Sequence, residues 1–183
     1  MRSKVTYQKG DSFKRIRVHE AGHVVAYYLL GYGVKSVWVA RKGKTIDGRT
    51  RIAGFARCRR IAHRELDLPR TIMWHTPRSW KRATITCLAG MIAETYFFGK
   101  SNCADDSPDV EELDGIFQRI KHALPREEDE TTIEATKWFS KPKYMKAVAA
   151  VANALKTKPR MNGLDVEKII RSTGLKPLKK WKK

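Results

Sequence analysis

The sequence lacks the features that mark membrane, secreted and ATP-driven proteins. No apolar run reaches the roughly 18 residues of a membrane-spanning helix. Residues 1–15 contain no apolar stretch of the kind found in a signal peptide. The phosphate-binding pattern GxxxxGK[ST] is also absent. We therefore expect a cytoplasmic protein with no transmembrane segment and no P-loop ATPase of its own.

Cysteine is scarce, with three residues at positions 58, 87 and 103 and no CxxC spacing. An odd number without that spacing predicts neither a disulfide framework nor a thiolate zinc cluster. Repeats and low-complexity linkers are missing as well. The 183 residues, 42% of them hydrophobic, are expected to form a single domain with a real core.

Acidic residues are few, at 19 against 38 lysines and arginines, which gives a net charge of +19. The charge is uneven, because eleven acids lie between residues 105 and 134, whereas residues 156–183 carry ten basic and two acidic residues. Basic blocks attract anionic partners. With no aromatic-interleaved RNA signature and no zinc finger, we expect only weak and non-specific nucleic-acid binding. A solvated surface, or one that attracts acidic protein substrates, is the alternative.

Hydrophobic periodicity predicts a mainly helical chain with one β-hairpin. The expected helices run from about 12 to 30 and over 77–98, 109–124, 127–139, 142–156 and 164–172. Strands are expected at 34–40 and 49–58, joined by a turn at 41–48 that contains two glycines. The isolated Gly54 in the second strand indicates close approach of another backbone. Residues 59–76 are expected to be irregular.

The stretch with the clearest chemistry is His19-Glu20-Ala21-Gly22-His23, inside the first helix, which we expect to be amphipathic. Helical residues four apart share a face, so His19 and His23 can direct two imidazole nitrogens at one zinc ion. Glu20 can then serve as the general base, as in zinc peptidases. The alternative is two core histidines and a solvated glutamate. The apolar neighbours of Glu20 weigh against it, because an unpartnered carboxylate among them is costly.

A catalytic zinc site takes a third protein ligand and leaves one position open. The remaining histidines lie in basic or charged stretches and are expected at the surface: His63, His75 and His122. Carboxylates are better candidates. Glu94 lies in the middle of an apolar helix, and three acids lie at the start of the next one: Asp105, Asp106 and Asp109. The residues alone leave this choice open.

Four stretches together resemble the peptidase domain of the FtsH family, the AAA-linked zinc proteases. They are VHEAGHVVAYYLLG at 18–31, the strand pair with Gly54 and Phe55, LAGMIAETYFFG at 88–99 and SPDVEELDGIFQRI at 107–120. The resemblance covers residues 13–121 well and 138–170 more loosely. It implies that His19, His23 and Asp109 bind one Zn²⁺ and that Glu20 is the general base.

By the same resemblance, Glu94 hydrogen-bonds a ligand histidine and fixes its tautomer. The sequence departs from the family at three positions, with Met91 for arginine, Thr95 for glutamate and Pro108 for asparagine. These departures keep Glu94 open as an alternative third ligand. The family's membrane helices and ATPase are absent from this sequence. We therefore expect a stand-alone peptidase that acts on flexible polypeptides or receives them from a separate ATPase or adaptor.

Together these observations predict an α+β, mainly helical, zincin-like domain. Its expected parts are a metal-site core at 12–124, a helical bundle at 127–172 and a basic tail at 174–183. The expected function is zinc-dependent hydrolysis of unfolded proteins. The substrate would add a strand to the hairpin edge beside Gly54 and Phe55. The alternatives are a zinc-stabilised binding module with a basic surface and a pseudoenzyme; the oligomeric state stays open.

Overall fold

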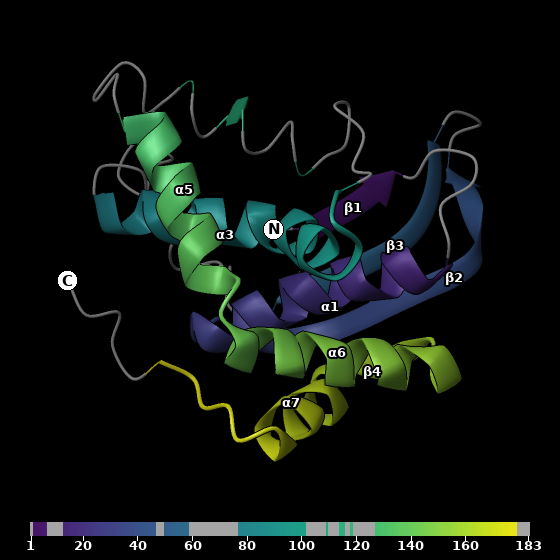
Figure 1. Cartoon of the computed structure of the whole chain (residues 1–183). Coiled ribbons are helices and arrows are strands. Elements are labelled where there is room, and N and C mark those ends of the chain that lie inside the picture. The colour runs from purple at the N-terminus through teal and green to yellow at the C-terminus, as the bar shows by residue number, and fades with distance from the viewer. Residues whose placement is uncertain are drawn as a thin grey trace.

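The computed structural model describes residues 2–6, 13–46, 50–58, 77–101, 109, 114–115, 118 and 127–178. It is a mainly helical α+β fold with a small antiparallel sheet (Figure 1). The helices are α1 (Phe13–Leu29), α3 (Pro77–Phe98), α5 (Glu127–Phe139), α6 (Pro142–Thr157) and α7 (Gly163–Ser172). The strands are β1 (Arg2–Thr6), β2 (Val34–Ile46), β3 (Thr50–Cys58) and β4 (Arg160–Asn162), in the sheet order β1-β3-β2-β4.

The helices follow their predicted bounds closely, because their periodicity and end signals are clear. α1 ends where Gly31 and Gly33 adopt positive φ angles of 77° and 68°, which a residue with a side chain rarely adopts. The helix predicted at 109–124 lies largely outside the described residues, although Asp109, Asp114, Gly115 and Gln118 are helical. The irregular stretch predicted at 59–76 lies outside them entirely.

The sheet differs from the predicted hairpin in three ways. β2 continues to Ile46, where a turn was expected to begin at residue 41, and a register shift between Val39 and Lys44 absorbs the intervening residues. β1 and β4 were not predicted, since five and three residues are too few to show an alternating pattern. β1 pairs with β3, and β4 pairs with β2 over Ser36–Trp38.

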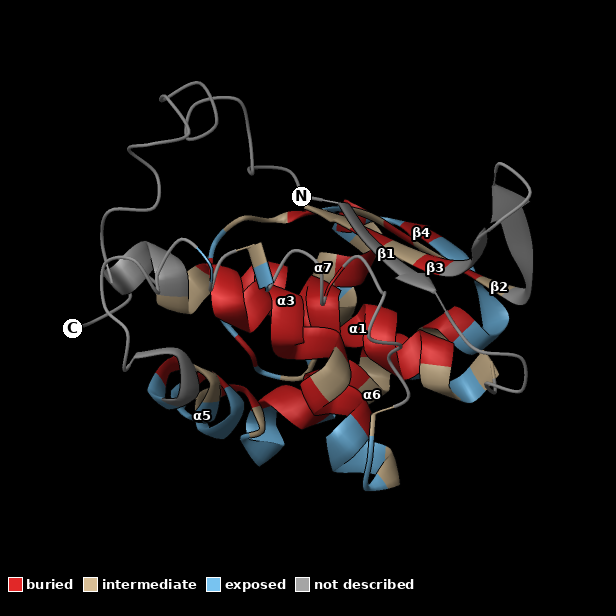
Figure 2. Ribbon diagram, turned by 90° about the horizontal axis from the view of Figure 1, so that it is seen from above, coloured by how far each residue is buried: buried red, intermediate tan, exposed pale blue. Residues whose placement is uncertain are grey.

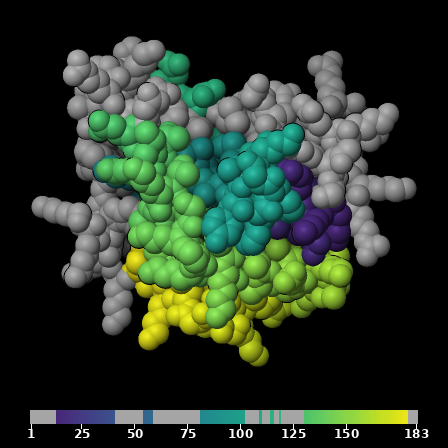
Figure 3. Space-filling model, viewed as in Figure 1, coloured from purple at the N-terminus to yellow at the C-terminus, as the bar shows by residue number. Residues whose placement is uncertain are grey.

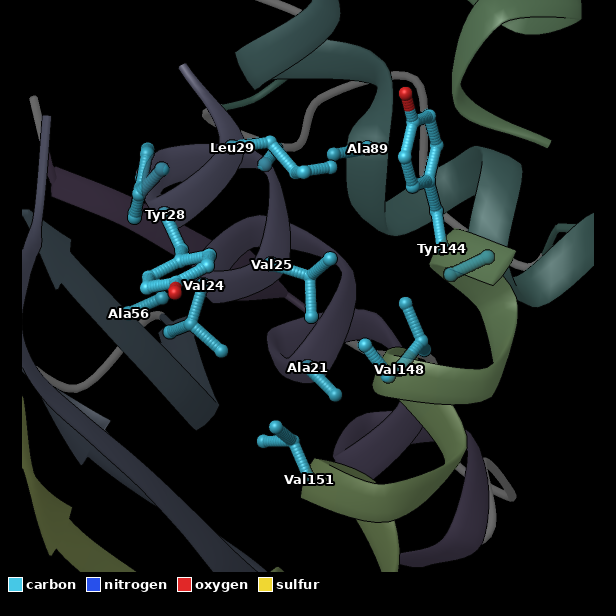
Figure 4. Packing of buried hydrophobic residues seen from close by; sticks show 14 of the residues in the cluster. Ala21, Val24, Val25, Tyr28, Leu29, Ala56, Ala89, Tyr144, Val148 and Val151 are labelled. Carbon is cyan, nitrogen blue, oxygen red and sulfur yellow. The ribbon is translucent and has the colours of Figure 1, made fainter. Parts of the chain in front are cut away.

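Helix α1 is buried on all sides, so the expectation of an amphipathic helix was wrong. Every residue from Ile16 to Leu30 is buried. Figure 2 shows the sheet on one side of the buried α1 and α3, with α6 on the other. In Figure 4, side chains of α1 meet apolar residues of β3, α3 and α6: Ala56, Ala89, Val148 and Val151. Polar side chains on such a helix must find partners inside the core.

The C-terminal helices complete the core instead of forming a bundle of their own. The guanidinium Nη1 of Arg17 in α1 donates to the carbonyl oxygen of Ala152 in α6 at 2.9 Å. Residues 174–178, the first part of the expected basic tail, lie against the end of α1. Leu175 is buried, and the amide nitrogen of Leu178 donates to the carbonyl oxygen of Leu29 at 3.0 Å. Residues 179–183 of the predicted tail lie outside the described residues.

Within the described part of the chain, no helix combines the length and the apolar character needed to cross a bilayer.

Close packing of α1 against α3 depends on a glycine in the HExxH stretch. A Cβ atom at Gly22 would overlap the carbonyl oxygen of Ala89 and lie 3.0 Å from the Cβ of Ala93. The obstacle is backbone, which cannot rotate away as a long side chain does. At Gly115, by contrast, no atom of the described residues lies within 4 Å of the position of an added Cβ.

We therefore predict opposite effects for two glycine-to-alanine changes. Gly22→Ala should destabilise the protein by about 1–3 kcal/mol, because α1 and α3 must separate. Gly115→Ala should be neutral or stabilise by up to about 1 kcal/mol, since alanine favours the helix. Urea unfolding of both variants beside wild type measures the difference. Equal stabilities would show that the α1–α3 contact is not tight.

Candidate metal centre

Two histidines of α1 present the same ring atom to one point in the core. His19 and His23 are both fully buried, and their Nε2 atoms lie 2.9 Å apart. The Nδ1 atom of His23 lies 2.8 Å from the carbonyl oxygen of Thr86. The Nδ1 atom of His19 lies 2.7 Å from Oε1 of Glu94. Because a carbonyl and a carboxylate accept hydrogen bonds, each Nδ1 is a donor, and the lone pairs for a metal are on Nε2.

Asp109 completes a cluster of three ligand atoms. Its Oδ2 atom lies 3.2 Å from Nε2 of His19 and 3.3 Å from Nε2 of His23, and the residue is 1% exposed. The three possible ligand atoms lie within 4.8 Å of one another. Two imidazoles and one carboxylate are a donor set that zinc accepts, with a fourth position left for water. The residues present therefore fit a zinc ion.

Glu94 lies on the far side of the His19 ring, away from the cluster. It is fully buried in α3, and its second oxygen, Oε2, accepts a hydrogen bond from Arg15 Nη1 at 3.3 Å. Arg15 Nη1 also donates to the carbonyl oxygen of Lys100 at 2.9 Å, just beyond the end of α3. Glu94 therefore contacts His19 at the nitrogen that points away from Asp109, and it is not among the three clustered ligand atoms.

The charges within the cluster shift its protonation. Burial lowers the pKa of His19, but hydrogen bonds and charges from Asp109 and Glu94 outweigh burial and raise that pKa well above 6.5. Burial likewise tends to raise the pKa of Asp109, whereas His23 and His19 hold it well below its usual range. Without a metal, His19 therefore keeps its proton to a higher pH than an ordinary histidine.

Glu20 is the unusual member of the group. It is fully buried, and neither carboxylate oxygen has a hydrogen-bond partner among the residues that the structure describes. Burial raises the pKa of Glu20 well above 4.5. The solvated glutamate of the alternative interpretation is therefore not observed. A buried, unpartnered carboxylate costs free energy, so its retention beside two histidines suggests a chemical use.

Two glycines make room for these side chains. A Cβ atom at Gly54 in β3 would overlap the carboxylate of Glu20 and lie 2.6 Å from its Cγ. A Cβ atom at Gly90 in α3 would overlap the ring of His19. Gly54 was expected to mark the approach of a backbone, but the group that approaches is the Glu20 side chain. Gly90 was not predicted as a site residue, although its small neighbours in α3 indicated tight packing.

The predicted substrate edge is not an edge in the structure. Gly54 and Phe55 lie in β3, which is an interior strand, because β1 pairs along it from Arg57 to Ile52. A peptide cannot add to a strand whose two sides are already hydrogen-bonded. The other candidate ligands lie outside the described residues: His63, His75, Asp105, Asp106 and His122.

Comparisons with known proteins add no assignment. No family model matches the chain, and no curated protein matches it.

Proposed function

We propose that this protein is a zinc-dependent endopeptidase in which His19, His23 and Asp109 hold the metal and Glu20 is the general base. The observation that carries the proposal is the state of Glu20. Its carboxylate is buried, unpartnered among the described residues and adjacent in sequence to a metal-ligand candidate. A purely structural site has no use for such a group. The resemblance of residues 18–31 and 88–99 to FtsH peptidases supports the same assignment.

In this proposal the chain's own residues control where the proton goes. Zinc, when bound, supplies the Lewis acidity that polarises a peptide carbonyl and makes water acidic near neutral pH. An oxygen of Glu20 accepts the proton of the attacking water and then delivers it to the nitrogen of the leaving amine. The raised pKa of Glu20 makes its carboxylate a stronger base for the first transfer. Hydrogen bonds to Glu94 and to the carbonyl of Thr86 favour the tautomer in which Nδ1 carries the proton and Nε2 carries the lone pair that can bind a metal.

A second candidate function is a structural zinc site in a non-catalytic binding module. The observation in its favour is the complete burial of His19, Glu20 and His23. Structural zinc sites are closed, whereas catalytic ones must admit water and substrate. The two candidates share the ligand set and differ in the role of Glu20, so the experiments that separate them concern Glu20.

The first test compares two isosteric changes that each remove one negative charge. Asp109→Asn removes a proposed ligand, so zinc content should fall from about one equivalent per chain to well below half an equivalent. Glu94→Gln removes the partner of His19 and should weaken binding by about 10–100-fold without abolishing it. Metal analysis after metal-replete purification, followed by titration with a competing chelator, measures both. If Glu94→Gln lost its zinc and Asp109→Asn only bound it more weakly, Glu94 would be the third ligand.

Zinc binding should release protons, because His19 must lose the proton that its raised pKa retains above pH 6.5. The apparent affinity for zinc should therefore increase as the pH rises through that pKa, by about tenfold per pH unit for one proton. Calorimetry at one pH in two buffers with different ionisation enthalpies counts the protons. A binding enthalpy that is the same in both buffers would contradict a protonated apo site.

The decisive variant is Glu20→Gln. The amide has nearly the shape of the carboxylate, so zinc content and thermal stability should stay near wild type. It cannot take up a proton, and the rate of peptide hydrolysis should fall by about 10²–10⁴. Unfolded casein and a quenched peptide library are suitable substrates, with a chelator as control. Glu134→Gln, a matched change at an exposed ion pair with Lys81, should leave the rate unchanged.

Two outcomes would refute this assignment in different ways. If wild type and Glu20→Gln cleave equally well, Glu20 is not the base. If both proteins hold zinc and neither cleaves, the structural-site candidate replaces the peptidase.

A further inference from the structure

The last described part of the chain carries exposed charges of nearly one sign. Residues 137–178 contain ten basic residues and two acidic ones. Every one of the ten is exposed, including those between the helices. They are Lys137, Lys141, Lys143, Lys146, Lys156, Lys158, Arg160, Lys168, Arg171 and Lys176, and we call them the basic surface.

The two acidic residues of this segment are engaged within the fold. Asp165 accepts hydrogen bonds from Lys158 Nζ at 2.7 Å and from Asn162 Nδ2 at 3.3 Å, at the start of α7. Glu167 Oε1 accepts a hydrogen bond from the backbone amide of Val34 at 2.9 Å. Among the residues that the structure describes, Lys158 is the only member of the basic surface in an ion pair. The positive charge is therefore not cancelled locally.

Five of the ten charges lie on two helices that pack against each other, α6 and α7. In α6, Lys146 lies opposite the buried Val148, and Lys156 is exposed near the C-terminal end of the helix. In α7, Lys168 and Arg171 lie opposite the buried Val166 and Ile170. The two helices form the lower part of the face shown in Figure 3. Lys146 and Lys156 are about 15 Å apart along α6, and about four base-pair steps of a duplex span a similar length.

The other side chains of the segment indicate which anion this surface suits. Its three aromatic residues are not exposed: Phe139 and Tyr144 are buried, and Trp138 is partly buried. Bases of a single strand therefore find no aromatic platform on which to stack. Leu164, 64% exposed, is the only large apolar side chain exposed in residues 137–178, so little can insert into a membrane. Phosphates of a duplex need only the cations.

We propose that the basic surface binds the phosphate backbone of double-stranded nucleic acid without reading its sequence. Each lysine or arginine that neutralises a phosphate releases a counterion, so the affinity depends steeply on salt. The basic surface contains none of the metal-ligand candidates. The inference is therefore independent of the proposed peptidase activity.

The test uses the full-length, zinc-replete chain and a labelled DNA duplex of about 20 base pairs and mixed sequence, followed by fluorescence anisotropy across a salt series. Lys146, Lys156 and Lys168 are replaced together by glutamine. The matched control replaces three exposed lysines outside the basic surface: Lys14, Lys35 and Lys100. Both triple variants lose the same charge. Circular dichroism and zinc content check that each one folds.

We expect the slope of log Kd against log salt to fall by about 2–3 in the basic-surface variant, with at least about tenfold weaker binding at about 0.1 M salt. The control should bind within about twofold of wild type. An unlabelled duplex of unrelated sequence should displace the labelled duplex as effectively as an unlabelled duplex of the same sequence does. Equal weakening in both variants would overturn the proposal, because net charge alone would then explain the binding.

Two further results would also overturn the proposal. One is a single strand of the same length that competes better than the duplex. The other is binding to phosphatidylserine vesicles without binding to the duplex, which would show that the basic surface binds membranes instead of nucleic acid.

Discussion

The burial of ionisable side chains on α1 is the constraint on which the rest of the structure depends. Imidazole and carboxylate groups in a core are costly unless they pair with one another. His19 is held between Glu94 and Asp109, and His23 between the carbonyl of Thr86 and Asp109. These pairs exist only if α3 lies directly against α1, which is why glycines stand where the two helices meet. On α1, Glu20 is the residue whose buried side-chain oxygens have no hydrogen-bond partner among the described residues, and Gly54 lies beside it.

The same contacts that offset burial also organise the site. The hydrogen bonds on Nδ1 of both histidines determine which nitrogen faces the centre before any metal arrives. Arg15 links Glu94 to the carbonyl of Lys100, so the partner of His19 is itself held in place. A site arranged in this way loses little entropy when it binds a cation. This arrangement has a cost. Without a cation, the Nε2 atoms of His19 and His23 lie close together beside the buried carboxylate of Asp109.

The histidine helix could be predicted from the sequence, because spacing within one helix depends only on local geometry. The choice between Asp109 and Glu94 could not be made from the sequence, since both are carboxylates distant along the chain from the two histidines. Which nitrogen of His19 each one meets depends on how α3 crosses α1 and on where the chain after α3 places Asp109. β1 and β4 were missed because such short strands are stabilised by pairing with β3 and β2, and their own pattern is weak. α1 was expected to be amphipathic because its apolar residues recur at roughly helical spacing, whereas Arg17, His19 and His23 also find partners inside the core.

The late position of α6 and β4 in the chain sets an order of events during synthesis on the ribosome. Arg17 finds its acceptor at Ala152, 135 residues later, and Tyr28 finds Leu175 after 147. Until those residues leave the exit tunnel, α1 has no partner on one side, and its apolar surface stays open to chaperones. Long-range contacts of this kind also slow folding, because a large loop must close before they form. The helix that carries both histidines is thus made early and covered last.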